Sequence, residues 1–157
     1  MHCVRKVTED LYWVGSNDRR LELFENIFPI QKGVSYNSYL LLDEKTVLFD
    51  TVDNAVGRQF LENIAAVLNG RTLDYLVINH MEPDHCALIE DLHLRYPDMK
   101  LIGNAKTFPM IDQFYGMDLD DKKDHHQRRR DVLLRKTHTS LCDGANGALA
   151  GSYDDLR

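Results

Sequence analysis

The segment LDYLVINH at residues 73–80 is an almost unbroken apolar run of strand length. Runs of this kind are typical of strands that are covered on both faces of a sheet. The segment after it, at 86–97, has apolar residues at helical spacing and ends at a proline. Residues 100–104 are again strand-like, and residues 105–116 are helical up to a glycine. Two successive strand–helix units predict an α/β layer structure, with helices packed on a sheet.

The first seventy residues extend this pattern. Short segments rich in β-branched and aromatic residues predict strands at 11–15, 35–42 and 46–50. Only three residues, DEK, separate the last two segments, so we expect a hairpin with antiparallel strands. Asp53 or Asn54 can then cap a helix, which Asn69-Gly70 ends.

Length and charge exclude several classes of protein. A chain of 157 residues forms about one domain, and a net charge of −6 argues against nucleic-acid binding, which needs a basic face. No apolar run approaches the roughly 20 residues of a membrane helix. The amino terminus, MHCVRKVTEDLYWVG, is interrupted by charges where a signal peptide is apolar, so a cytoplasmic protein is expected. The three cysteines are too widely spaced to indicate a disulfide framework or a thiolate metal site.

Four ionisable residues follow the apolar run at 73–79: His80, Glu82, Asp84 and His85. In open α/β sheets, ligands bind at the carboxyl ends of the strands. In an extended loop, alternation would direct His80, Glu82 and Asp84 to one side. Imidazole and carboxylate donors suit iron, manganese or zinc. Because three protein groups and water satisfy one metal, four donors in six residues predict a site for two metals.

Simpler interpretations of the same residues exist. They could be solvated loop charges, with one histidine at the start of the helix predicted from Cys86. Asp84 could be the N-cap of that helix, because aspartate is a favoured capping residue.

The pattern His80-x-Glu82-x-Asp84-His85 resembles the metal motif of flavodiiron proteins, also called A-type flavoproteins. Two further segments, KGVSYNSYLL at 32–41 and VLFDTVD at 47–53, are similar to the same family, and the resemblance covers about residues 7–121. It implies an α/β fold, the metallo-β-lactamase-like αββα sandwich, of which this chain holds only the first half.

The resemblance also implies a reaction: reduction of dioxygen to water, or of nitric oxide to nitrous oxide, at a non-haem diiron centre. His80 and Glu82 would bind one iron, and Asp84 and His85 the other. Electrons would come from FMN in a flavodoxin-like carboxyl-terminal domain of a homodimer, supplied by a redox donor such as rubredoxin or a flavin reductase. No residue of this chain is expected to bind FMN.

The remaining family ligands, which include a histidine in a His-Trp-Pro-Glu stretch, are absent from this sequence. We expect residues 1–122 to be the amino-terminal part of the diiron domain and residues 123–157 to be an aberrant tail, out of frame or disordered. Read one nucleotide later, codons for Ala148 to Gly151 permit His-Trp-Pro-Glu. This indicates a frameshift near residues 123–127, which makes His125, His126 and His138 accidental rather than replacement ligands.

Two other functions compete with the diiron oxidoreductase. A zinc-dependent hydrolase of the same fold carries His-x-His-x-Asp-His, in which a metal-bound hydroxide attacks an ester or amide. Glu82, an anionic oxygen donor in place of that second histidine, favours redox iron. A non-enzymatic interaction domain with a disordered tail would bind metal negligibly.

Overall fold

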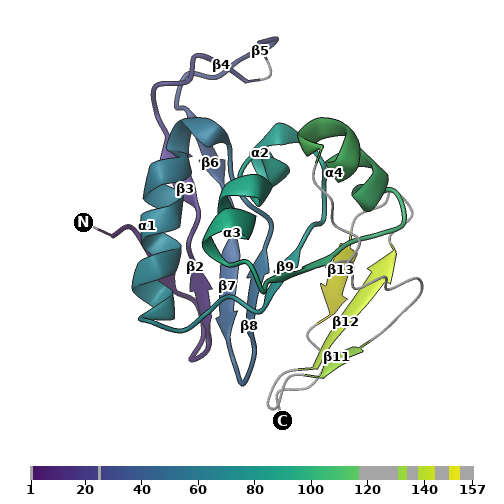
Figure 1. The fold of residues 1–157 in the computed structure, drawn as a ribbon. Helices are drawn as coiled ribbons and strands as arrows, with labels where there is room; N and C mark the ends of the chain where they lie inside the picture. The colour runs from purple at the N-terminus through teal and green to yellow at the C-terminus, as the bar shows by residue number, and fades with distance from the viewer. Residues whose placement is uncertain (1, 25, 117–130, 134–137, 144–148, 153–157) are drawn as a thin grey trace.

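The computed structural model describes residues 2–24, 26–116, 131–133, 138–143 and 149–152. Its largest element is a mixed sheet in the strand order β1-β2-β7-β8-β9-β10 (Figure 1). The strands are β1 Arg5–Lys6, β2 Leu11–Trp13, β7 Tyr39–Leu42, β8 Thr46–Phe49, β9 Tyr75–Val77 and β10 Lys100–Ile102. β7 and β8 are antiparallel, which confirms the predicted hairpin, whereas β8, β9 and β10 run parallel to one another.

The helical segments among the described residues are the 3₁₀ turn η1 Asn54–Val56 and the helices α1 Gly57–Leu68, α2 Pro83–Cys86, α3 Ile89–Arg95 and α4 Thr107–Tyr115. Figure 1 shows α1 and α3 in front of the sheet. The Asp53 carboxylate accepts from the Ala55 N–H and so caps η1, whereas α1 itself follows Val56 without a side-chain cap. The predicted helix ends are confirmed, since Asn69 and Gly116 end α1 and α4 in left-handed conformations. None of these helices is long and apolar enough to span a bilayer.

The strand predicted at 35–42 is two strands. β6 Val34–Tyr36 pairs with β3 Ser16–Asp18 in a separate small sheet, and only β7 joins the main sheet. The chain crosses between sheets at Ser38, whose hydroxyl donates to the Asp50 carbonyl (2.9 Å) and whose carbonyl accepts from the Val14 N–H (3.0 Å). A side chain at Gly15, where β2 and β3 part, would collide with the Tyr36 carbonyl. A further two-stranded arm, β4 Leu23–Phe24 with β5 Phe28–Pro29, projects from this region (Figure 1).

Three strands lie within the carboxyl-terminal segment. β11 Asp131–Leu133, β12 His138–Asp143 and β13 Leu149–Ser152 form an antiparallel sheet in that order. The sequence pattern beyond residue 122 predicted neither strand nor helix, so these strands differ from the expectation. The division at residue 122 and the slipped reading frame stay predictions, and His125, His126 and Ala148 lie outside the described residues.

The main sheet is apolar on both faces. Leu48 and Leu76 are fully buried and pack with Phe60 of α1 in the larger core cluster. Their neighbours Val47 and Val77, which alternation directs to the opposite face, belong to a second buried cluster. This two-sided burial explains the near-continuous apolar run in β9 and agrees with the layered α/β fold.

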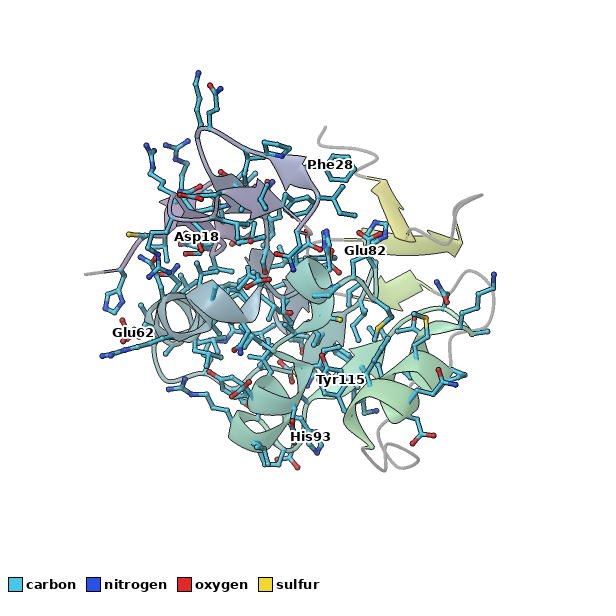
Figure 2. All side chains as sticks on the ribbon, turned by 90° about the horizontal axis from the view of Figure 1, so that it is seen from above. Asp18, Phe28, Glu62, Glu82, His93 and Tyr115 are labelled. Carbon is cyan, nitrogen blue, oxygen red and sulfur yellow. The ribbon has the colours of Figure 1, made fainter. Side chains whose placement is uncertain are left out.

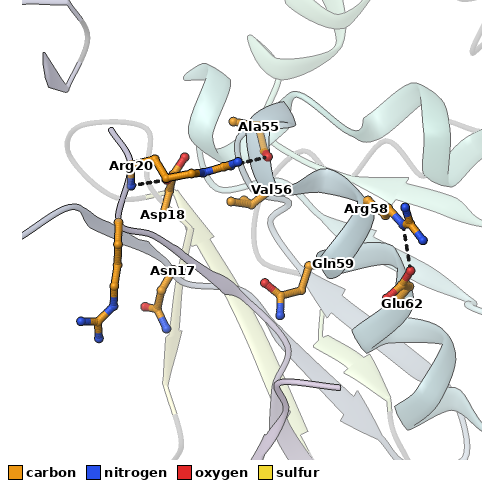
Figure 3. Close-up of a pocket in the computed structure, with 9 residues that line it drawn as sticks. Asn17, Asp18, Arg20, Ala55, Val56, Arg58, Gln59 and Glu62 are labelled. Carbon is orange, nitrogen blue, oxygen red and sulfur yellow. Dashed lines mark hydrogen bonds and ion pairs between the residues drawn. The ribbon is translucent and has the colours of Figure 1, made fainter. Parts of the chain in front are cut away.

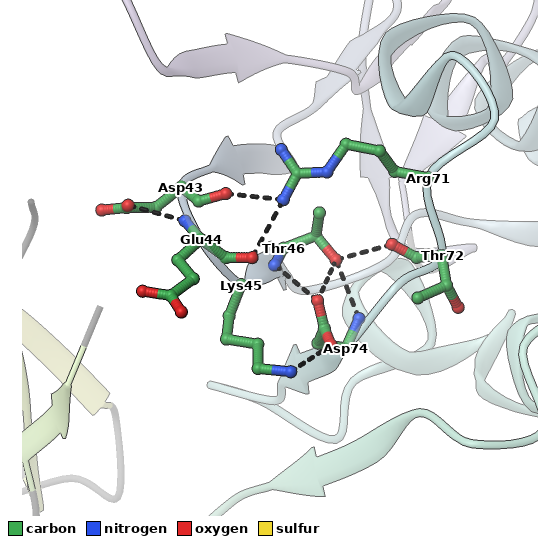
Figure 4. A network of polar contacts seen from close by, with 7 residues as sticks. All are labelled: Asp43, Glu44, Lys45, Thr46, Arg71, Thr72 and Asp74. Carbon is green, nitrogen blue, oxygen red and sulfur yellow. Dashed lines mark hydrogen bonds and ion pairs between the residues drawn. The ribbon is translucent and has the colours of Figure 1, made fainter. Parts of the chain in front are cut away.

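A polar network closes the end of the sheet where β8 begins (Figure 4). The Asp74 carboxylate accepts from the Thr46 N–H (2.8 Å) and hydroxyl (3.0 Å) and pairs with the Lys45 ammonium (3.1 Å). Burial of Asp74 opposes its ionisation, but these contacts outweigh burial and hold its pKa below the ordinary value. Arg71 donates to two carbonyl oxygens of the β7–β8 turn. The network ties the hairpin to the segment between α1 and β9.

Candidate metal centre

The predicted site lies where the parallel strands β8 and β9 end. Directly after β8, Asp50 takes a left-handed conformation with φ of 57° and is 6% exposed. One carboxylate oxygen of Asp50 accepts from the Asn79 N–H (2.7 Å), and the other accepts from the Asn79 side-chain amide (3.0 Å). Asp50 therefore joins the carboxyl ends of two neighbouring strands at the edge where α/β sheets bind ligands.

The chain becomes helical earlier than predicted. Pro83 occupies the first position of α2, where its fixed φ suits a helix and its missing N–H is not needed. The amides of His85 and Cys86 both donate to the Glu82 carbonyl (2.8 and 3.0 Å). Asp84 lies inside this turn, so the expected extended loop and the alternative of an Asp84 N-cap are both wrong.

The helical turn changes which donors converge. Glu82, Asp84 and His85 each offer a ligand atom within 4.8 Å of those of the other two. The His80 ring lies beside the His85 ring, with 5.0 Å between centroids and a tilt of 52°. All four predicted residues are thus near one another, but His85, rather than His80, joins the two carboxylates. In Figure 2, which looks down on this edge, Glu82 lies between Phe28 of β5 and Tyr115 of α4.

Asp50 fixes the orientation of His85. The Nδ1 atom of His85 lies 3.1 Å from an Asp50 carboxylate oxygen, and the Nε2 atom lies 3.7 Å from an Asp84 oxygen. Because a carboxylate only accepts hydrogen bonds, Nδ1 carries a proton, and in the neutral ring Nε2 holds the lone pair on the side that faces Asp84. The hydrogen bond that His85 donates to Asp50 raises the pKa of His85 against the opposing effect of burial. The Thr51 N–H also holds the His85 carbonyl (2.8 Å).

The arrangement fits a metal ion. Two atoms that each lie about 2.1 Å from one ion are at most about 4.2 Å apart, so the 3.7 Å between Asp84 and His85 lies within the span of a single ion. The wider spread of 4.8 Å across Glu82, Asp84 and His85 needs small side-chain shifts for one ion, or a second ion. Carboxylate oxygens with imidazole nitrogen suit iron, manganese or zinc.

Two residues that support the site were missed in the sequence. Asp50 and Asn79 were not predicted as site residues, although Asp50 lies within the segment VLFDTVD that carries part of the family resemblance. The sequence feature that could have indicated Asp50 is a polar residue directly after an apolar strand. Asn79 shows the same feature, since it follows β9.

A second polar region lies beside the amino-terminal end of α1 (Figure 3). It is a hollow of about 540 Å³ between the turn after β3 and the start of α1. Four of its charged residues are paired locally: Arg20 with Asp18 (3.4 Å), and Arg58 with Glu62 (3.1 Å). None of the four candidate donors lines it.

With the site in place, comparison with known proteins decides the family. The sequence model of a protein family, described as ODP family beta lactamase, matches residues 34–141 of this chain. The chain belongs to this family. The match reaches about twenty residues beyond residue 121, where the motif resemblance ends.

Curated relatives are similar to this chain over most of its length. The anaerobic nitric oxide reductase flavorubredoxin of Pectobacterium atrosepticum is 39% identical over 142 residues, which cover 90% of this chain and 26% of that protein. The flavorubredoxin of Salmonella arizonae is 35% identical over the same length, 27% of its own. The chain therefore spans about a quarter of the curated relatives that it matches.

Solved structures agree on the fold. Rubredoxin oxygen:oxidoreductase from Desulfovibrio gigas superposes with a TM-score of 0.86 at 24% identity, over 96% of this chain and 38% of that one. The flavodiiron protein from Giardia intestinalis gives 0.82 at 23%, over 91% and 34%. The resemblance to flavodiiron proteins and the incomplete metallo-β-lactamase-like fold are confirmed.

Proposed function

We propose that this chain provides part of the diiron centre of a flavodiiron oxidoreductase that reduces dioxygen to water, nitric oxide to nitrous oxide, or both. The observation that carries the proposal is the convergence of Glu82, Asp84 and His85 at the carboxyl ends of parallel strands. Membership of the ODP family and the flavorubredoxin relatives support it.

Within this proposal, Asp84 and His85 bind one iron, and His80 and Glu82 bind the other. The 3.7 Å between Asp84 and the Nε2 atom of His85 supports the first pair. The contact between the His80 and His85 rings supports a neighbouring position for the second. Bound iron would supply the electrons for reduction of the substrate, after delivery from FMN elsewhere in a homodimer and from a rubredoxin or a flavin reductase.

The residues of this chain have distinct tasks in the proposed centre. Glu82 and Asp84 contribute negative charge that offsets the charge of the metal ions. Asp50 keeps the His85 proton on Nδ1, so that Nε2 is free to coordinate. The further family ligands are missing from the sequence, so we propose that the chain alone binds iron weakly and does not turn over substrate.

Sequencing the gene tests the frameshift: an alternate frame over residues 142–156 that lacks His-Trp-Pro-Glu contradicts it.

Anaerobic titration of the purified chain with Fe(II) tests the proposal. Glu82→Gln and Asp84→Asn should each weaken binding at least about tenfold, as loss of a metal ligand requires. Glu90→Gln, the matched control on the exposed first turn of α3, should leave it unchanged. Equal affinity in all variants contradicts the site. Preference for Zn(II) together with ester hydrolysis supports the hydrolase instead.

A further inference from the structure

The candidate ligand turn is held at both of its ends by hydrogen bonds that involve the buried residue Cys86. The Cys86 thiol donates to the carbonyl of Met81, the residue between His80 and Glu82, at 3.3 Å. The Cys86 carbonyl accepts a hydrogen bond of 2.7 Å from the Tyr115 hydroxyl, which lies at the carboxyl-terminal end of α4. The Tyr115 oxygen is also 3.8 Å from the Cys86 sulfur.

These contacts meet a physical need of the turn. The last carbonyl groups of a helix have no partner within the helix, and α2 consists of a single turn. Cys86 is only 4% exposed, so water is a poor substitute for a side-chain donor there. Burial raises the pKa of the Tyr115 phenol, which therefore remains a donor throughout the usual pH range of binding experiments.

The turn thus has two supports on different elements. Asp50 and Thr51, which follow β8, hold the His85 ring and carbonyl. Tyr115 holds the Cys86 carbonyl from the side of α4, and the Cys86 thiol holds the Met81 carbonyl within the turn itself. Without the second support, the segment from Met81 to Cys86 could shift relative to the strands while remaining attached to Asp50. A shift of 1 Å is enough to spoil convergent donor geometry.

We propose that Cys86 and Tyr115 are positioning residues for the candidate metal centre, which together fix the two ends of the ligand turn so that Glu82, Asp84 and His85 converge. The proposal rests on the proposed function only in taking these residues as ligands. It gives a role to the Cys86 thiol, for which the spacing of the cysteines indicated neither a disulfide nor a thiolate metal site.

Amide hydrogen exchange of the 157-residue chain without metal tests the positioning role directly. The amides of His85, Cys86 and Ala87 all donate within the turn. In Tyr115→Phe they should exchange at least about tenfold faster than in the unmodified chain, while amides of α1 keep their rates. Tyr96→Phe, which alters another half-buried tyrosine, is the matched control and should leave all of these rates unchanged. Unchanged exchange of the turn in Tyr115→Phe, or equal acceleration throughout α1, overturns the proposal.

Metal binding supplies the second measurement, with Co(II) as the probe because its visible spectrum reports ligand geometry. Tyr115→Phe and Cys86→Ala should each weaken Co(II) binding about tenfold and alter the spectrum. Cys86→Ser should restore both, since its hydroxyl can donate to the Met81 carbonyl. Equal effects of Ser and Ala overturn the thiol's role. If the unmodified chain binds no metal, the proposed function fails, whereas the exchange rates still decide whether Cys86 and Tyr115 position the turn.

Discussion

Replacement of Asp50 by asparagine tests the support of the candidate centre most directly. Asparagine has the same shape and tolerates the left-handed backbone at this position. The carboxylate accepts from the Asn79 N–H (2.7 Å), the Asn79 side-chain amide (3.0 Å) and His85 Nδ1 (3.1 Å). An asparagine has only one acceptor oxygen, so its amide nitrogen must face at least one of these donors.

The structure sets the expected size of the effect. The Asn79 side-chain amide and His85 Nδ1 donate to the same carboxylate oxygen. An asparagine whose oxygen keeps the Asn79 N–H therefore loses two charged hydrogen bonds, each worth about 1.5–3 kcal/mol, and the opposite orientation loses one and sets two N–H groups against each other. His85 can recover one neutral bond by moving its proton to Nε2 and accepting at Nδ1. We therefore expect the free energy of unfolding to fall by about 2–4 kcal/mol. In the same step Nε2 loses the lone pair that would bind metal.

Urea unfolding of the metal-free chain measures the first effect, and ¹⁵N NMR of the His85 ring measures the second. Asp53→Asn is the control, because Asp53 caps η1 and asparagine caps equally well. A change in unfolding free energy below about 0.5 kcal/mol in Asp50→Asn, the range of an ordinary surface substitution, together with a proton still on Nδ1, would falsify the assigned role of Asp50.

Three further predictions concern the scaffold. Asp74 has a lowered pKa in the folded chain, so the stability that it contributes is present above its unfolded pKa of 3.8 and is lost as pH falls through the folded pKa. Asp74→Asn should therefore reduce the fall in melting temperature at acid pH, which thermal unfolding measures. Phe60→Ala, in the fully buried core, should lower the free energy of unfolding by about 3–5 kcal/mol in urea; a loss below 1 kcal/mol would contradict the packing. Gly15→Ala should cost about 1–3 kcal/mol because the added methyl meets the Tyr36 carbonyl, and it should reduce exchange protection in β3 and β6; unchanged protection there would argue against that close approach.

The sequence was most informative where the physical signal is local. Asn69 and Gly116 end their helices as predicted, since each takes the left-handed conformation that their residue types tolerate. The DEK hairpin and the layered α/β arrangement likewise followed from short patterns. The strand at 35–42 failed because its division at Ser38 depends on hydrogen bonds to Asp50 and Val14, which are distant in sequence.

The same distinction applies to the candidate site. The identities of His80, Glu82, Asp84 and His85 as candidate donors could be read from residue type and strand position. Their grouping could not, because Pro83 starts a helical turn where alternation assumed an extended chain. The support from Asp50 lies 35 residues away, and no periodicity in the sequence connects it with His85.

This division between local donors and distant supports has a thermodynamic consequence. Because the candidate donors lie within six consecutive residues, the unfolded chain can also bind a metal ion as a short flexible chelate. A ligand stabilises a fold only to the extent that it binds the folded chain more tightly than the unfolded one. The metal-induced rise in melting temperature therefore measures how much Asp50, Cys86 and Tyr115 organise the turn, rather than how well the donors bind metal.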